Sequence, residues 1–324
     1  MQERWASGTR EARPGLRSWA PPPGPFRCAA PRLDAGARAL ARRGGPAKLA
    51  ARRPRAVFGF RQRSLHAWPR RLQTWWFNRF SNYAPRTQRV YRVTLNGRHY
   101  KRVVLPDSYQ AQRVAASLAE FAADRIYPRV IFARERELWV EYVEGRAIRS
   151  VDVHLVGQMA RLLARINQRK ARRVPTAETP FLGALQIDLC FLRDVGVLDA
   201  GVYRALEERT QQIAPAALWV GYDCTDAILK NFVLDRDGRL VGVDVESLGV
   251  DQLIGSGAAK ACTRWLGAHR DSFLARMRAA GAPDFQAYLP FVELCFLAFW
   301  TKASLIEGKH RYVDAALFER FSRD

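Results

Sequence analysis

Residues 224–246 read CTDAILKNFVLDRDGRLVGVDVE, and this stretch decides the expected fold. Two apolar runs, 232–234 and 240–243, flank an Asp-Gly pair at positions 237 and 238. A short strand, an Asp-Gly turn and a second strand are typical of a β-hairpin. Because a hairpin returns the chain to the level at which it began, we expect Asn231 and Asp244 to lie at the same end of the sheet.

Three polar residues of this stretch have the spacing that phosphoryl transfer from ATP requires. Asp226 precedes Asn231 by five positions, and Asp244 follows Asn231 by thirteen. An Asp can accept or orient the proton of an attacking hydroxyl, while an Asn and a second Asp can hold the Mg²⁺ ions that bridge the ATP phosphates. The alternative interpretation is an ordinary surface hairpin with acidic residues near its ends.

The same stretch resembles the catalytic block of the aminoglycoside and choline phosphotransferases, a branch of the protein-kinase-like superfamily. The family motifs, usually written H-G-D-x-H-x-x-N and I-D-x-E, match at Asp226, Asn231, Asp244 and Glu246. The sequence departs from them at Cys224, where the family usually has His, and at Ile228. Lys230 instead resembles the tyrosine kinases, in which a cation at this place approaches the transferred phosphate.

The resemblance covers about residues 90–265 and implies an α+β protein with a two-lobed protein-kinase-like fold. A small mixed β-sheet lobe and a larger, mostly helical lobe would hold ATP and Mg²⁺ between them. We expect an N-terminal extension and the small nucleotide-binding lobe over 57–145, and the helical catalytic lobe over 146–324.

The resemblance also implies a role for each matching residue. Asp226 would orient the nucleophile, and Lys230 would stabilise charge as the bond breaks. Asn231 and Asp244 would bind Mg²⁺, and Glu246 would support the metal-binding Asp or a second ion.

Residues 89–105 form the clearest predicted hairpin, because Asn96-Gly97 accepts the positive φ angles of a type I′ turn. In the resemblance its second strand presents a Lys to the ATP phosphates, and Lys101 is the expected residue. Arg102 is the alternative, since neighbouring side chains of a strand point to opposite faces. The usual glycine-rich loop is not visible upstream. Glu120 comes too late in the predicted helix over 108–125 to be assigned as the partner of Lys101.

Two predicted strands, 129–133 and 137–143, end in a segment that resembles the family's hinge. The hinge binds adenine through backbone groups, so the resemblance implies that the Glu141 carbonyl and the Val143 amide bind it here. A plain edge strand that ends in a Gly turn is the alternative.

The sequence after residue 146 predicts mainly helices, over 153–173, 181–194, 199–213, 257–280 and 285–306. In the first of these, Leu155, Met159, Leu162, Leu163 and Ile166 recur at helical spacing before a basic end at 169–173. The last is long and apolar but contains Glu293 and Lys302. We therefore expect a buried helix there and not a membrane span.

Positive charge is concentrated at the N-terminal end. Of the net charge of +22, residues 1–70 contribute +13 from 16 Lys/Arg and three Asp/Glu, and the other 254 residues contribute +9 from 37 and 28. Residues 1–56 are rich in Pro, Gly and Arg without apolar periodicity, which predicts a disordered basic tail. Such a tail can bind nucleic acid through charge, although no specific nucleic acid is predicted. It can also be an organellar presequence or an unselected extension.

Residues 66–82 (HAWPRRLQTWWFNRFSN) combine aromatic side chains with arginines. A helix of this kind can lie on an anionic membrane surface, and it can equally pack against its own domain. The five cysteines are scattered without a C-x-x-C pair, which favours reduced thiols. We therefore expect a cytoplasmic protein, with peripheral contact at the inner face of a membrane as an open alternative.

The predicted function is transfer of the γ-phosphoryl group of ATP to a hydroxyl of a small molecule or a cell-envelope sugar. Two alternatives stay open. A pseudokinase would keep the fold and bind partners without catalysis, which the missing glycine-rich loop and Cys224 favour. A nucleic-acid-binding protein would act through the basic tail.

Overall fold

A computed structural model describes residues 61–64, 89–308 and 313–323. The expected basic tail and the aromatic segment 66–82 lie outside these residues. The strands are β1 (Arg61–Ser64), β2 (Arg89–Leu95), β3 (Arg98–Val104), β4 (Val130–Arg134), β5 (Glu137–Glu141), β6 (Gly145–Ala147), β7 (Arg172–Pro175), β8 (Ala217–Cys224), β9 (Phe232–Asp235), β10 (Leu240–Gly242) and β11 (Leu248–Leu253). The α-helices are α2 (Ser108–Ala119), α3 (Val153–Gln168), α4 (Phe181–Asp194), α5 (Ala200–Ile213), α6 (Ser256–Ala261), α7 (Arg270–Ala279), α8 (Leu289–Ile306) and α9 (Ala315–Arg323).

The first sheet has five antiparallel strands in the order β1-β2-β3-β5-β4. The predicted hairpin at its centre is confirmed: β2 pairs with β3, and Asn96 and Gly97 have φ angles of 50° and 75°. Helix α2 follows β3, and Asp107 caps its start, because the Asp107 carboxylate accepts the Gln110 N–H at 2.7 Å. The helix ends at Ala119, six residues before the expected end.

Two three-stranded sheets follow, in the orders β10-β9-β6 and β11-β8-β7. The hairpin expected within 232–243 is confirmed, since Leu240 pairs with Leu234 and Gly242 with Phe232. The expectation that the rest of the chain is mainly helical missed the strands of the other sheet. No short turn joins these strands directly, because their pairing brings together segments far apart in the chain.

The predicted helix 153–173 is wrong at its basic end. Helix α3 ends at Gln168, Lys170 takes a φ of 53°, and the chain then forms β7, which pairs with β8. The apolar residues at helical spacing stop at Ile166, so helix beyond this point would bury no further apolar surface. Sheet pairing with β8 therefore decides the conformation of the basic residues.

The predicted helix 257–280 is also broken. Helix α6 continues as a π-helical turn over Cys262–Leu266, and Gly267 then takes a φ of 50° before α7 begins. A glycine adopts this left-handed conformation at little cost, so it redirects the chain between the two helices.

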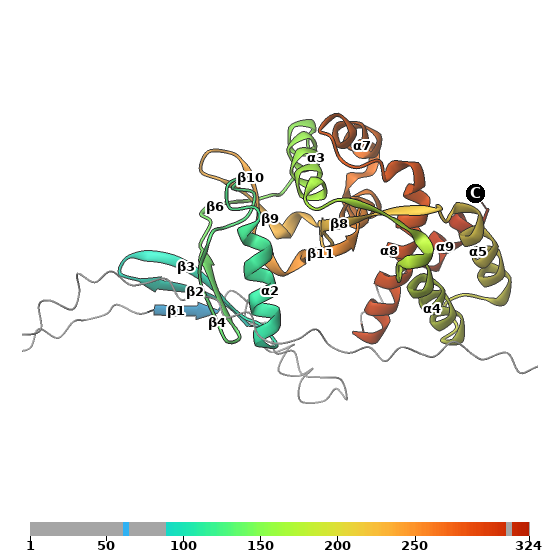
Figure 1. Cartoon of the computed structure of the whole chain (residues 1–324), viewed down its shortest axis with the longest axis horizontal. Helices are drawn as coiled ribbons and strands as arrows, with labels where there is room; N and C mark the ends of the chain where they lie inside the picture. The colour runs from blue at the N-terminus through green and yellow to red at the C-terminus, as the bar shows by residue number, and fades with distance from the viewer. Residues whose placement is uncertain (1–60, 65–88, 309–312, 324) are drawn as a thin grey trace, which may run out of the picture. The chain divides into compact units, whose positions relative to one another are not determined.

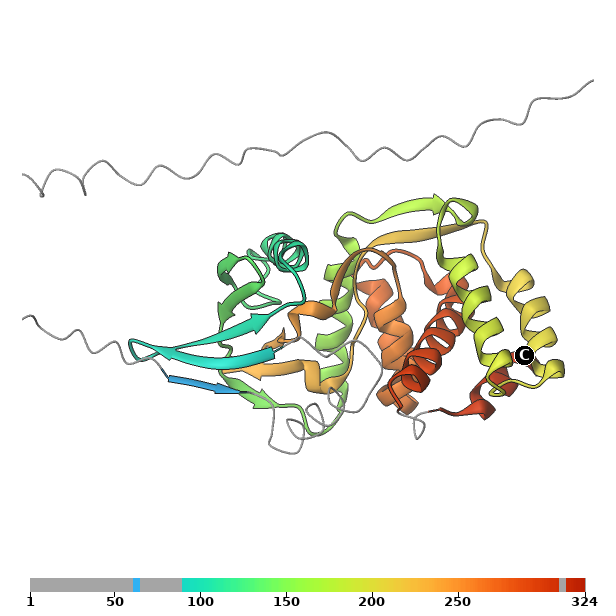
Figure 2. The ribbon, with the colours of Figure 1, turned by 90° about the horizontal axis from the view of Figure 1, so that it is seen from below.

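Figure 1 shows the first sheet with α2 on one side of the described chain and α3 to α9 on the other, with β9 and β10 between them. Helix α3 packs beside α7, and α8 contacts both α4 and α6. Figure 2 shows the neighbouring helices α4, α5 and α8 from below. The apolar face predicted for α3 is confirmed, since Leu155, Met159, Leu162, Leu163 and Ile166 are all buried.

By length and composition, Gln286–Ile306 is the one helical stretch among the described residues that could cross a membrane, and 56% of its apolar window is buried inside the protein. It contains α8, whose Phe291, Val292, Leu294 and Leu297 lie in the core with at most 2% exposure.

Candidate functional site

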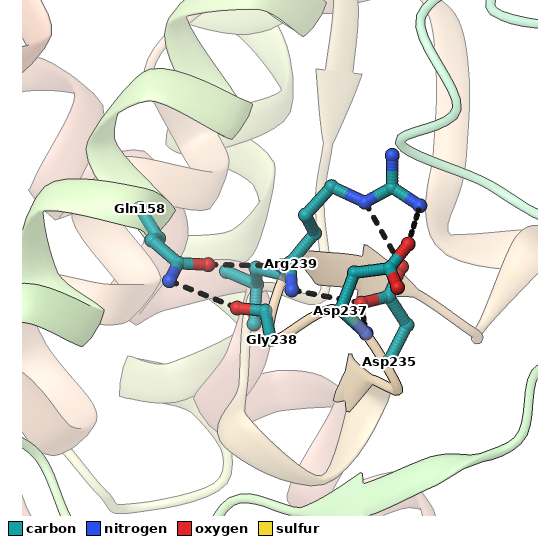
Figure 3. Close-up of polar contacts among 6 residues, drawn as sticks. Gln158, Asp235, Asp237, Gly238 and Arg239 are labelled. Carbon is teal, nitrogen blue, oxygen red and sulfur yellow. Dashed lines mark hydrogen bonds and ion pairs between the residues drawn. The ribbon is translucent and has the colours of Figure 1, made fainter.

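The turn between β9 and β10 is held by its own side chains (Figure 3). The Asp235 carboxylate accepts the backbone N–H groups of Asp237 at 2.9 Å and Arg239 at 2.8 Å. The Arg239 guanidinium in turn contacts Asp235 at 3.1 Å and Asp237 at 2.7 Å. An Asp at the start of a tight turn commonly satisfies the free backbone donors in this way, so local chemistry fixes the hairpin.

Gln158 of α3 attaches this hairpin to the helical part of the protein (Figure 3). Its Nε2 donates to the Gly238 carbonyl at 3.1 Å, and its Oε1 accepts the Leu240 N–H at 2.9 Å. At the base of the hairpin, the Asn231 carbonyl accepts the N–H groups of Val243 at 2.8 Å and Asp244 at 3.4 Å. The expected juxtaposition of Asn231 and Asp244 is therefore present.

Asp226 lies directly beside Asn231. The Asn231 Nδ2 donates at 2.8 Å to both the backbone carbonyl and the carboxylate of Asp226. Because the amide nitrogen is used in this way, the Asn231 Oδ1 is left as the side chain's remaining acceptor. The sequence motif thus folds into one hydrogen-bonded unit.

Lys260 of α6 forms an ion pair with the Asp226 carboxylate. The Lys260 side chain is only 13% exposed, and its ammonium lies 5.8 Å from the centre of the Phe296 ring. Burial of Asp226 favours its neutral form, but the hydrogen bond and charge of Lys260, with help from Asn231, hold the pKa of Asp226 below its ordinary value. Asp226 is therefore a carboxylate at neutral pH.

Lys260 was not among the residues expected from the sequence. It lies 34 positions after Asp226 and outside either motif. The one local signal was the small-residue run Gly255-Ser256-Gly257, which permits close packing at the start of α6. A Cβ atom at Gly257 would lie 2.3 Å from the Cys224 carbonyl oxygen, so only glycine fits there.

The buried Asp223 fastens the start of α6 to the end of β8. Its carboxylate accepts the Gly255 N–H at 2.8 Å and the Gly257 N–H at 3.3 Å. Burial raises the pKa of Asp223 to about 6, although these two backbone donors favour its charged form. Because α6 carries Lys260, Asp223 helps to position the cation beside Asp226.

Two further contacts fix the segment around Asp226. The Trp265 Nε1–H, in the π-helical turn, donates to the Ala227 carbonyl at 2.8 Å. The Thr225 N–H donates to the Ser247 carbonyl at 2.9 Å. The residues on either side of Asp226 are therefore fixed by two different turns, one at Trp265 and one at Ser247.

Cys224 and Lys230 occupy different settings from those that the family motifs suggest. Cys224 is buried with its Sγ 3.5 Å from the Ser247 Oγ, and burial raises the pKa of its thiol to about 12. It is a neutral core side chain. Lys230 is exposed, and among the described residues it makes no hydrogen bond to Asp226. The cation bonded to Asp226 is Lys260.

Asp244 differs from Asp226 in having no partner for its carboxylate among the described residues. The Asp244 backbone carbonyl accepts the Ser247 Oγ–H at 2.7 Å, which fixes the main chain and leaves the carboxylate available. Glu246 follows in the 3-10 turn Val245–Ser247 and is half-buried.

The fit of these residues to a metal rests on their donor atoms. Within the described ranges, no three His, Cys, Asp or Glu side chains are grouped so that they could hold a metal ion. Asn231 and Asp244 still offer two oxygen donors at one end of the hairpin. This is the small protein share that Mg²⁺ usually takes when phosphate oxygens and water complete its octahedron.

A pocket of about 220 Å³ lies next to the hairpin and is lined by the residues that the sequence predicts to bind the nucleotide. Its lining includes Lys101, Glu141, Tyr142, Val143, Val233 and Val243. The Val143 N–H donates to no described residue. The predicted hinge segment and β9 thus form two of the pocket's walls.

The structure distinguishes Lys101 from Arg102. The Lys101 Nζ donates to the Val243 carbonyl at 2.5 Å, directly before Asp244 in the chain. Arg102 points to the opposite face of β3, where it pairs with Glu137 and lies 5.9 Å from the Trp139 ring. Of the two cations, Lys101 therefore faces the pocket.

No carboxylate is bonded to Lys101 within the described residues. Glu120, at the end of α2, pairs with Lys170 at 2.5 Å. Nearby, Asp124 pairs with Arg165 and Arg169, which joins the turn after α2 to α3. The acids around α2 thus hold the protein together and do not reach the pocket lysine.

The chain matches no protein-family model and no curated protein. Solved structures do share its fold. A macrolide 2'-phosphotransferase from Brachybacterium faecium aligns with a TM-score of 0.51 at 13% identity, over 81% of this chain and 90% of its own. A choline kinase from Streptococcus pneumoniae gives 0.51 at 12%, over 72% and 88%. An aminoglycoside phosphotransferase gives 0.50 at 12%, over 79% and 98%.

Identities this low show a common fold and leave the activity to be argued from the site. The chain therefore has the two-lobed protein-kinase-like fold, in the form that the aminoglycoside, macrolide and choline phosphotransferases share.

Proposed function

We propose that the protein is an ATP- and Mg²⁺-dependent phosphotransferase that acts on a hydroxyl-bearing acceptor. The observation that supports this most is the hydrogen-bonded group of Asp226 and Asn231 beside Asp244, next to a pocket that contains Lys101. This group combines a hydroxyl-orienting carboxylate, two oxygen donors for a cation and one fixed ammonium. Those are the parts that phosphoryl transfer needs, since the reaction depends on positioning and charge.

The pocket would hold the nucleotide. Adenine would lie between the hinge segment and β9, with the Glu141 carbonyl and the Val143 N–H as hydrogen-bond partners. Lys101 would hold the phosphate oxygens. Asn231 and Asp244 would hold Mg²⁺, which neutralises charge on the phosphates when bound, and Glu246 would support Asp244.

Asp226 would act on the acceptor by orientation. Its pKa is held below the ordinary value, so it is a weak base, and a loose phosphoryl-transfer transition state requires little proton removal early in the reaction. The acceptor oxygen forms the new bond to the γ-phosphorus as the bond to the ADP oxygen breaks. The acceptor's proton passes to Asp226 or to the transferred phosphate.

Lys260 would take the role expected for Lys230, which is to stabilise charge as the bond breaks. Its ammonium pairs with the Asp226 carboxylate, and it would add positive charge near the transferred group. The acceptor itself is a hydroxyl-bearing small molecule or a cell-envelope sugar. The proteins with the same fold are named for macrolide, choline and aminoglycoside acceptors.

Thermal unfolding of the full chain with ATP, with and without Mg²⁺, tests the nucleotide site. We expect ATP to raise the melting temperature and Mg²⁺ to increase that shift, because both ligands bind the folded state. Transfer of label from γ-labelled ATP to a panel of aminoglycosides, macrolides, choline and sugars then tests the reaction. A shift that is identical without Mg²⁺, together with no transfer, would favour a nucleotide-binding pseudokinase.

A further inference from the structure

A second cavity, of about 550 Å³, lies where β6, the loop 148–152 and the first turns of α3 meet. It is within the size range of about 300–1,000 Å³ that small-molecule sites occupy. Its wall includes Arg146, Arg149, His154 and Gln158. None of these residues belongs to the site proposed above.

This cavity and the nucleotide pocket share no lining residue, and strand β9 contributes one residue to each. Leu234 lines the cavity, whereas its neighbour Val233 lines the nucleotide pocket. Successive side chains of a strand point to opposite faces. Arg146 pairs directly with Leu234, which places the arginine on the face of the cavity. A ligand here would therefore contact a set of residues that does not overlap with the lining of the nucleotide pocket.

The lining has an excess of positive charge that the protein does not neutralise. Arg146 and Arg149 are exposed, and neither forms a hydrogen bond or an ion pair with any residue in the described part of the chain. Asp152 is the acid in the lining, and its Oδ1 already accepts the Leu155 N–H at 2.7 Å as the cap of α3. Two guanidinium groups at one cavity match the oxygens of a phosphate, to which arginine donates paired hydrogen bonds.

The wall formed by α3 is held by hydrogen bonds. The Gln158 amide donates to the Gly238 carbonyl at 3.1 Å and contacts the His154 Nε2 at 2.7 Å, while its oxygen accepts the Leu240 N–H at 2.9 Å. Leu155 forms a buried part of the lining. A wall that is already ordered lowers the entropic cost of binding, so the two arginines are the main groups that a ligand would have to order.

We propose that this cavity binds a small molecule that carries a phosphate group, at a site separate from the nucleotide pocket. The site does not depend on the proposed phosphotransfer, because none of its residues takes part in that chemistry. Inorganic pyrophosphate is a suitable probe, since it presents the same oxygens without a base or sugar.

The experiment is calorimetric titration of the full chain with pyrophosphate in the absence of Mg²⁺. We expect Arg146→Ala/Arg149→Ala to bind at least about tenfold more weakly than the wild type, and Arg149→Glu to be weakened similarly. Arg98→Ala removes an exposed arginine that lines neither pocket, at the start of β3, and is the matched control. Lys101→Ala should bind pyrophosphate like the wild type, because Lys101 lies in the other pocket.

Unchanged affinity in the arginine variants, or loss of affinity in Lys101→Ala, would overturn the proposal, as would the absence of binding to the wild type. Melting temperatures without ligand show whether each variant is folded. Stabilisation by ATP should persist in the double arginine variant. If the wild type binds pyrophosphate but does not bind ATP, that result contradicts the phosphotransferase proposal and leaves the second site intact.

Discussion

Asp226 and Asp244 lie on either side of the β9–β10 hairpin, and their carboxylates have opposite surroundings. Asp226 is bonded to Lys260 and to the Asn231 amide, and its side chain is 34% exposed. Asp244 has its backbone fixed by Ser247, while its carboxylate has no partner among the described residues. The protein thus neutralises one acid internally, whereas the carboxylate of the other has no bonded cation among the described residues.

This difference follows from what each acid would have to do. A carboxylate that orients a hydroxyl must keep its position before the acceptor arrives, and a bonded ammonium provides that. A carboxylate that binds Mg²⁺ would have to lose any internal cation first, at a cost in affinity. The contrast therefore favours an orienting role for Asp226 and a metal-binding role for Asp244.

The largest expected effect is on turnover. Asp226→Ala should lower the rate of phosphoryl transfer by at least about 100-fold while ATP affinity changes little, because the carboxylate acts on the acceptor. Asp226→Asn is the matched variant, since it keeps the shape and loses the charge. Steady-state kinetics and ATP titration provide the measurements. Near-normal turnover in both variants would mean that Asp226 does not orient the acceptor, and the proposed difference in role between Asp226 and Asp244 would fail.

Asp223 fastens the helix that carries Lys260, and its contribution can be tested by the pH dependence of stability. Because the pKa of Asp223 is raised to about 6, folding favours its protonated form. Its contribution to stability is complete below the unfolded value near 3.8 and is lost as the pH rises through about 6. The free energy of unfolding should thus fall by up to about 3 kcal/mol from this group between pH 4 and 7.

Asp223→Asn cannot ionise, so its stability should decline less over the same interval. Urea unfolding of the wild type and the variant at several pH values measures the difference. Parallel pH profiles for the two proteins would mean that Asp223 does not carry this titration.

The Asp244 side is tested by metal. A ligand present at 100 times its Kd stabilises the folded state by about 2.7 kcal/mol in total. Asp244→Ala should lose the part of the stabilisation by ATP that depends on Mg²⁺. The part that does not need Mg²⁺ should remain, since Lys101 and the hinge segment are unchanged. An Mg²⁺ effect that survives in Asp244→Ala and disappears in Asp226→Ala would reverse the two assignments.

The smallest expected effect separates the two lysines. Lys260→Met should reduce turnover about tenfold, because Asp226 loses its bonded cation, and Lys260→Arg should recover part of that loss. Lys230→Met should cost less than about threefold, since Lys230 is exposed. Turnover numbers compared at saturating ATP decide between them. A larger loss at Lys230 would restore the assignment made from sequence.

Much of the site could be predicted because its signals are local. Asn96-Gly97 and Asp237-Gly238 indicated two hairpins that the structure contains. Because the second hairpin returns the chain to the level at which it began, it placed Asn231 beside Asp244. The resemblance supplied Lys101, Glu141 and Val143, which do line one pocket. Their roles, with those of Asp226, Lys230 and Glu246, stay predictions until the experiments above are done. So do the membrane contact, the domain limits and the tail.

What the sequence determined by itself is the order of strands and turns around residues 224–246, because turn chemistry and alternation act between neighbours in the chain. Only the tertiary structure decided which cation meets which acid. Lys260 reaches Asp226 across 34 residues, Lys101 and not Arg102 faces the pocket, and β8 draws the basic end of the predicted helix into a sheet. Each of these depends on how distant segments pack, and packing free energy outweighs local preference wherever the two disagree.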